Sequence, residues 1–138
     1  MSGVRLLDDD ELAPEAKAVF GDIRAARGSE HVNNFWRALA HDPALLARVW
    51  GQVKATMGPG ALDPLTKEMI YVAVSIANNC EYCVASHMAA ARAKGMSEAQ
   101  LMELIAVVGL ASQTNRIASG LRVPVDGRFA APPAAADS

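Results

Sequence analysis

The stretch DPLTKEMIYVAVSIANNCEYCVASH, residues 63–87, decides the fold class of this 138-residue chain. Asp63-Pro64 pairs a favourable helix cap with a favourable first helical residue, so we expect a helix to begin there. The later part of this helix, Met69–Ala77, is almost unbroken apolar sequence, which predicts a helix buried on all sides. Because Asn favours caps over helix interiors, Asn78-Asn79 predicts a break, with a new helix beginning at about Cys80.

The same signals recur on both sides of this stretch. Apolar residues fall three and four apart between Pro or Asx starts and Gly stops, and strand alternation is absent. We therefore predict an all-α fold, a bundle of about six helices. The other helices are expected at about residues 14–28, 32–41, 43–58, 80–94 and 97–120, the last opened by the capping-box pair Ser97 and Gln100.

The pattern predicts one helical domain over residues 1–120, followed by an irregular tail. Residues 121–138 lose the helical pattern and end in AAPPAAADS, which is low in complexity, so we expect this tail to be disordered. Gly109 inside the last helix is expected at a close packing contact. Large aromatic residues at helical spacing are expected in the core: Phe20, Phe35, Trp36 and Trp50.

Composition excludes several classes of protein. Of the residues 51% are hydrophobic and 20% charged, enough for one sizeable core. Thirteen Lys and Arg against fifteen Asp and Glu give a formal charge of -2 without a block of like charges, which disfavours nucleic-acid binding. No apolar run reaches membrane-spanning length, and the first residues, MSGVRLLDDDELAPEA, are acidic where a signal peptide is basic and then apolar. We expect a cytoplasmic protein with no nucleic-acid partner and no membrane partner.

The two cysteines, Cys80 and Cys83, form a single C-x-x-C. On a helix that begins at Cys80, Cys83 and His87 follow three and seven residues later, which places the three side chains on one face. Residues three apart on a helix have Cα atoms about 5 Å apart, within the range that a disulfide tolerates. Since a helix start also favours the thiolate, the form that attacks peroxides and disulfides, the pattern indicates a redox-active pair.

The same residues are compatible with three alternative hypotheses. In the first, the cysteines are small core residues, Glu68 is an ordinary first-turn acid and His87 is a partly exposed histidine. The second hypothesis is a zinc site made of Cys80, Cys83, His87 and either Glu68 or His41, against which stands the lack of a second Cys or His pair. The third hypothesis is a noncatalytic helical protein that completes its core only as an oligomer.

Glu68 completes a longer motif: a Glu, eleven residues, and then C-x-x-C-x-x-x-H formed by Cys80, Cys83 and His87. In this motif, and in the stretches ALAHDPALLARVW, LTKEMIYVAVSIANNC and GMSEAQL, the chain resembles a known family. It is the alkylhydroperoxidase D-like branch of the carboxymuconolactone decarboxylase superfamily. The resemblance covers roughly residues 34–118.

This resemblance implies an all-helical subunit that assembles into trimers or hexamers. It also implies a thiol-dependent peroxidase that acts on a small hydroperoxide and is regenerated by a dithiol or thioredoxin-like reductant. Cys83 would attack the peroxide and Cys80 would resolve the intermediate into a disulfide, while Glu68 and His87 would relay protons. No cofactor and no metal are expected.

One position departs from the family's pattern. The best-known members carry a His immediately before the distal Cys, where this chain has Tyr82. A phenol is a poor base at neutral pH, so a dithiol/disulfide exchange protein with little peroxidase activity is an alternative. The branch that decarboxylates carboxymuconolactone lacks the cysteine pair, which argues against that activity here.

Overall fold

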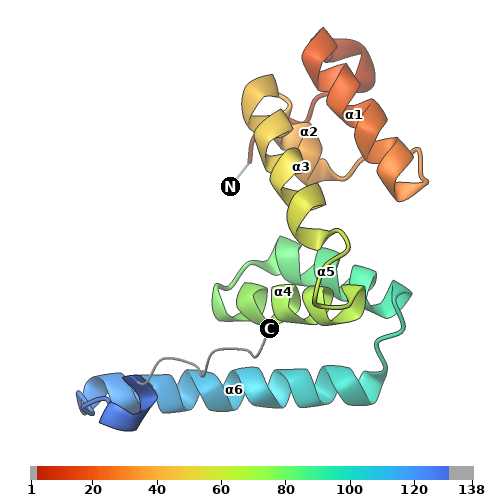
Figure 1. Cartoon of the computed structure of the whole chain (residues 1–138). Helices are drawn as coiled ribbons and strands as arrows, with labels where there is room; N and C mark the ends of the chain where they lie inside the picture. The colour runs from red at the N-terminus through yellow and green to blue at the C-terminus, as the bar shows by residue number, and fades with distance from the viewer. Residues whose placement is uncertain (1–2, 131–138) are drawn as a thin grey trace, which may run out of the picture. The chain divides into compact units, whose positions relative to one another are not determined.

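The computed structural model describes residues 3–130 of the chain, and that part is all-α (Figure 1). The described residues contain six α-helices and two short 3-10 helices, which confirms the predicted fold class. The chain divides into two compact units, one ending at Ala61 and one beginning at Leu62, and each is described by itself. The single domain over residues 1–120 stays a prediction.

The first unit contains one 3-10 helix and three α-helices: η1 (Asp9–Glu11), α1 (Pro14–Arg27), α2 (Asn34–Leu39) and α3 (Pro43–Met57). Their ends follow the predicted signals. α1 ends before Gly28, whose φ of 61° lies in the left-handed region that glycine adopts most readily. At the start of α3, the carboxylate of Asp42 accepts a hydrogen bond from the backbone N–H of Leu45 at 3.0 Å.

Aromatic side chains form the centre of the first unit's core, where α3 packs against α1 and α2. Phe20, Trp36 and Trp50 are buried, and the two indole rings meet edge to face with their centroids 5.4 Å apart. The expectation for Phe35 is wrong, because its side chain is 43% exposed. Adjacent residues on a helix point in different directions, so burying Trp36 turns Phe35 toward the surface.

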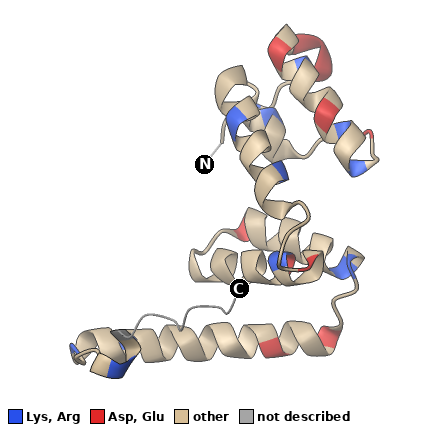
Figure 2. Cartoon of the chain, viewed as in Figure 1, with Lys and Arg blue, Asp and Glu red and all other residues tan. Residues whose placement is uncertain are grey.

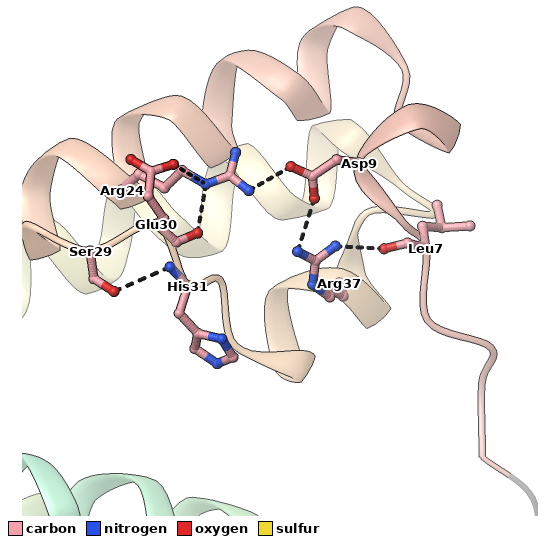
Figure 3. A network of polar contacts seen from close by, with 7 residues as sticks. All are labelled: Leu7, Asp9, Arg24, Ser29, Glu30, His31 and Arg37. Carbon is pink, nitrogen blue, oxygen red and sulfur yellow. Dashed lines mark hydrogen bonds and ion pairs between the residues drawn. The ribbon is translucent and has the colours of Figure 1, made fainter.

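An ion-pair network ties the segment before α1 to the helices of the first unit (Figure 3). The carboxylate of Asp9 accepts hydrogen bonds from Arg24 at 2.6 Å and from Arg37 at 2.9 Å. Arg37 also donates to the carbonyl oxygen of Leu7 at 2.9 Å. The hydrogen bonds from Arg24 and then Arg37 lower the pKa of Asp9 below its ordinary value, so the network is charged at neutral pH.

The second unit contains three α-helices and a short 3-10 helix: α4 (Pro64–Ala77), α5 (Glu81–Ala93), α6 (Glu98–Gly120) and η2 (Gly127–Ala130). α4 lies side by side with α5 and also packs against α6 (Figure 1). The carboxylate of Asp63 caps α4 through the N–H of Thr66 at 2.9 Å, and Ser97 and Gln100 form the predicted capping box of α6. Buried side chains near the junction of α5 and α6 form the core of this unit: Ala91, Met96 and Leu101, with Leu65, Met69 and Met88 packed against them.

The break between α4 and α5 lies where the two asparagines predicted it. Asn78 is the C-cap of α4, and Asn79 has a φ of 56°, a left-handed conformation that Asn tolerates better than most residues. The backbone N–H of Cys80 bonds to the carbonyl oxygen of Ser75 at 3.0 Å. This turn brings α5 alongside α4 and makes Cys80 the N-cap residue of α5.

Two expectations for the second unit are wrong. α4 is not buried on all sides, because Ile70, Tyr71 and Val74 are 48%, 39% and 53% exposed. The apolar run has a side that the neighbouring helices of its own chain do not cover. The predicted close packing at Gly109 is also not found, since a Cβ built there meets no other described atom within 4 Å.

After α6 the described chain has no regular structure except η2 (Gly127–Ala130), and the irregular tail over residues 121–138 stays a prediction. The rest of the predicted tail, residues 131–138, lies outside the described residues. Within residues 3–130, no helix combines the length and the apolar character needed to cross a bilayer.

Candidate active site

The cysteine pair lies at the start of α5. The Sγ atom of Cys80, the N-cap residue, accepts a hydrogen bond from the backbone N–H of Cys83 at 3.3 Å. A disulfide joins the two residues, whose Cα atoms lie 5.3 Å apart, close to the spacing expected from the sequence. Both cysteines are half-buried. The N–H groups of the first helical turn favour negative charge on sulfur, so this position suits a reactive thiolate once the disulfide is reduced.

Glu68 of α4 and His87 of α5 are in direct contact. The side-by-side packing of the two helices brings Oε2 of Glu68 to 2.7 Å from Nδ1 of His87, although the residues are 19 positions apart. Glu68 is only 6% exposed, so this hydrogen bond is shielded from water on the carboxylate side. Since Nδ1 is occupied, Nε2 is the ring nitrogen left to exchange a proton with a third group.

Lys94 binds the other oxygen of the same carboxylate. Its Nζ donates to Oε1 of Glu68 at 3.1 Å. Lys94 is the C-cap residue of α5, seven residues and so about two turns after His87. The helix ends there because Gly95 adopts a φ of 96°, which other residues rarely do. Each oxygen of Glu68 therefore has its own partner from α5.

Burial and hydrogen bonding act on Glu68 in opposite directions. Removal from water raises the pKa of its carboxyl group, whereas the hydrogen bonds from His87 and Lys94 and the charges of these two residues lower it. The lowering effects together exceed the effect of burial, so the pKa of Glu68 lies below its ordinary value of 4.5. Glu68 is therefore an anion at neutral pH, despite its burial.

The ring of Tyr71 covers one face of His87. The two rings stack with their centroids 3.5 Å apart and their planes inclined by 18°. Tyr71 follows Glu68 by three residues, so both project from the same side of α4. The stack and the hydrogen bond to Glu68 together fix the position and the plane of the imidazole.

The structure joins the four predicted residues into two pairs, Cys80 with Cys83 and Glu68 with His87. Cys83 and His87 are four residues apart on α5 and are therefore neighbours on its surface, with about 5–6 Å between their Cβ atoms. Tyr82, the departure from the family's pattern, is 44% exposed on the same helix.

Lys94 and Tyr71 were not predicted as parts of the site. Helical spacing carried a signal for both, because Lys94 is seven residues from His87 and Tyr71 is three from Glu68. That spacing selects a face of a helix, however, and not the partner that the face meets.

A cavity of about 460 Å³ opens beside Cys80. Its walls include Ile76, Asn79 and Val84 and are mostly carbon, and they include neither Cys83 nor His87. A small molecule in this cavity would lie against Cys80.

Within the second unit, the residues of the zinc hypothesis are not grouped as metal ligands. Over residues 3–130, no three side chains of His, Cys, Asp or Glu are grouped so that they could hold a metal ion. His41 instead has its Nε2 2.7 Å from the carbonyl oxygen of Arg5. The geometry gives the zinc hypothesis no support.

Comparison with known proteins places the chain in a family. The profile of the carboxymuconolactone decarboxylase family matches residues 43–126, which include every site residue from Glu68 to Lys94. The chain belongs to this family. The superfamily resemblance inferred from the Glu and C-x-x-C-x-x-x-H motif is thereby confirmed.

A solved structure identifies the branch within the carboxymuconolactone decarboxylase family. The crystal structure of the alkylhydroperoxidase AhpD core from Rhodospirillum rubrum is similar to this chain with a TM-score of 0.91 and 61% sequence identity. The match covers 96% of this chain and 99% of that one. The chain therefore has an AhpD-core-like fold.

Two further relatives have names that state no activity. An uncharacterized protein 4 in the cox locus of Paracoccus denitrificans is 32% identical over 92 residues, which are 67% of this chain and 69% of that protein. An uncharacterized protein of Cupriavidus necator is 31% identical over 77 residues, 55% of this chain and 68% of that protein.

Proposed function

We propose that this member of the carboxymuconolactone decarboxylase family is a thiol-dependent peroxidase that reduces a hydroperoxide through Cys83 and Cys80. The observation that carries the proposal is the buried Glu68–His87 hydrogen bond, one helical turn from Cys83. The Rhodospirillum rubrum relative, which carries the name of an alkylhydroperoxidase core, supports an organic hydroperoxide as the substrate.

The first half of the proposed cycle oxidises Cys83. Nε2 of His87 takes the thiol proton of Cys83, and the ionised Glu68 stabilises the imidazolium that forms. The thiolate attacks the terminal oxygen of the hydroperoxide, so that an S–O bond forms and the O–O bond breaks. The alkoxide that leaves takes the proton back from His87, and the products are an alcohol and a sulfenic acid on Cys83.

The second half restores the thiols. The Cys80 thiol attacks the sulfenic sulfur, which releases water and forms the Cys80–Cys83 disulfide. One thiol of a dithiol reductant then attacks the sulfur of Cys80 from the adjoining cavity and releases the thiolate of Cys83. The second thiol of the reductant attacks the mixed disulfide and releases Cys80, so that the reductant leaves as a disulfide. One hydroperoxide and one dithiol thus give one alcohol, one water and one disulfide.

We further propose that the chain works as a homo-oligomer, a trimer or a hexamer as the family resemblance implied. The middle of α6 carries no charged residue between Glu103 and Arg116 (Figure 2). Several apolar side chains in or next to this stretch are exposed in the single chain: Met102, Ile105, Val107 and Leu110. Burial between copies would remove this surface from water. Light scattering after size-exclusion chromatography tests the assembly, and a monomer at micromolar concentration would contradict it.

The peroxidase proposal is tested by following the thiols during one turnover. Fully reduced protein receives one equivalent of cumene hydroperoxide, and thiol content and intact mass are recorded with time. The wild type should lose both thiols and about 2 Da as the disulfide forms. Cys80→Ser should stop at the sulfenic acid and gain about 16 Da, whereas Cys83→Ser should not consume peroxide. Peroxide consumption by Cys83→Ser at the wild-type rate would refute the assignment of the nucleophile.

A dithiol/disulfide exchange protein is the second candidate, favoured by Tyr82 in the place where the best-known members have His. In that case reduced protein should ignore cumene hydroperoxide but exchange rapidly with an oxidised dithiol such as oxidised dithiothreitol. The same thiol count, with the two oxidants used in turn, separates the two functions.

A further inference from the structure

Lys94 contacts the proposed proton relay without belonging to the motif that predicted it. We propose that Lys94 is a positioning residue, which holds the Glu68 carboxylate so that Oε2 faces Nδ1 of His87 and which shares the negative charge of Glu68 with His87. The effect on peroxide turnover rests on the function proposed above. The expected effect of Lys94 on the protonation of His87 does not rest on that function, and it is measured separately.

The geometry supports a positioning role. Glu68 projects from α4, and both of its partners project from α5, with His87 on Oε2 at 2.7 Å and Lys94 on Oε1 at 3.1 Å. A carboxylate bound at both oxygens by groups about two helical turns apart cannot rotate without losing one of them. Lys94 therefore fixes the oxygen that faces His87.

The charge of Lys94 supports the second part of the proposal. Glu68 is nearly buried, with a side chain 8% exposed, and a buried carboxylate needs a compensating positive charge. Lys94 supplies one through its contact with Oε1, so the charge of Glu68 is not balanced by His87 alone. The charges that act on Glu68 come from Lys94 and His87, while Tyr71 covers the imidazole ring. Without Lys94, the negative charge of Glu68 would act on His87 alone and would favour its protonated form.

A purely structural role for Lys94 makes a different prediction. A cation after the last turn of a helix is stabilising through the helix dipole alone, whatever it contacts on the neighbouring helix. Such a role would change the stability of α5 but would leave the protonation of His87 unchanged. A measurement of the protonation of His87 therefore distinguishes the two roles of Lys94.

The test is an NMR titration of the histidine rings in the full-length disulfide form, in which the sulfur atoms do not titrate. Lys94→Gln removes the charge, and Lys94→Arg keeps it. Arg92→Gln is the matched control, because it removes a positive charge from the same end of α5, where Arg92 pairs with Glu98 and both side chains are at least half exposed. His87 is assigned from its missing signal in His87→Gln, and His31 and His41 serve as internal references.

Lys94→Gln should move the midpoint of the His87 titration to higher pH, because the charge of Glu68 then acts on His87 without the opposing charge of Lys94. Lys94→Arg and Arg92→Gln should leave the midpoint in place. A His87 midpoint in Lys94→Gln equal to that in Arg92→Gln would overturn the proposal. If Lys94→Gln does not fold, Lys94→Met, which keeps the alkyl stem, replaces it under the same criterion.

Peroxide consumption by the reduced proteins separates this proposal from the function on which it partly rests. With both correct, Lys94→Gln should be slower than the wild type near pH 6, where more of its His87 is protonated, and Lys94→Arg should recover the rate. A shifted His87 titration in a wild-type protein that consumes no peroxide would refute the peroxidase and leave Lys94 as the positioning residue. An active wild type with no shift in Lys94→Gln would refute the role of Lys94 alone.

Discussion

Replacing Glu68 by Gln should destabilise the protein at neutral pH and much less in acid. The pKa of Glu68 in the folded chain lies below its ordinary value of 4.5. Its stabilising contribution is therefore fully present above about pH 4.5 and is lost as the pH falls through the folded pKa. Gln has the same shape and does not titrate, so the difference between variant and wild type reports the charge.

The contacts of Glu68 set the size of the effect. A hydrogen bond between a buried carboxylate and His87 belongs to a class worth about 1.5–3 kcal/mol, and the ion pair with the 40% exposed Lys94 adds about 0.5 kcal/mol at most. Gln can keep one neutral hydrogen bond, worth about 1 kcal/mol. The net loss in the free energy of unfolding at pH 7 is then about 0.5–2.5 kcal/mol. For a chain of 138 residues this lowers the melting temperature by about 2–9 °C.

Thermal unfolding followed by far-UV circular dichroism at pH 7 and at about pH 3.5 measures the loss of stability in Glu68→Gln and its dependence on pH. The gap between wild type and Glu68→Gln should narrow in acid. Glu98→Gln is the control, because its carboxylate is 75% exposed and should matter by less than about 0.5 kcal/mol. An equal destabilisation by Glu68→Gln at both pH values would refute the stabilising role of the Glu68 charge.

Three further perturbations test other parts of the structure. Tyr71→Phe should keep the ring stack on His87 and the rate of peroxide consumption. Tyr71→Leu should lower the free energy of unfolding by about 0.5–1.5 kcal/mol and slow peroxide consumption. Equal rates in the two variants would contradict the positioning of His87 by the stack. Leu46→Ala leaves a cavity at a fully buried position and should lower the free energy of unfolding in urea by about 2–5 kcal/mol. Leu62→Ala, at a position 49% exposed, should lower it by less than about 1 kcal/mol. Asp42→Ala removes the cap of α3 and should lower the free energy of unfolding by about 0.5–2 kcal/mol, whereas Asp42→Asn should keep most of that stability. Unchanged stability in Asp42→Ala would show that the hydrogen bond from the Leu45 N–H does not stabilise the helix.

The helix ends were predictable from sequence because they depend on local chemistry. Asp63-Pro64, Asn78-Asn79 and Gly95 act on the backbone within one turn, and the structure begins and ends its helices at these residues. Burial was less predictable, because it depends on what lies opposite. The apolar run of α4 gave no information on which of its sides would be covered, and Ile70 and Val74 are exposed in the chain.

The candidate site shows the same division. The spacing of Cys80, Cys83 and His87 follows from the helix on which they lie, and Glu68 entered through a family motif. Lys94 could not be found in this way, because its contact with Glu68 joins residues 26 positions apart and depends on how α4 packs against α5. Contacts between helices are set by packing, which no local pattern in this chain encodes.

The disulfide at the start of α5 has a consequence for the energy of the folded chain. The stabilisation that a disulfide gives by restricting the unfolded chain grows with the length of the loop it closes, from about 2 kcal/mol at most for four residues to about 4.7 kcal/mol for a hundred. Cys80 and Cys83 are three positions apart, so their bond closes one of the shortest loops. Reduction should therefore lower the free energy of unfolding by about 2 kcal/mol at most. A protein built in this way can pass electrons through its sulfur atoms many times while its structure is maintained by other contacts.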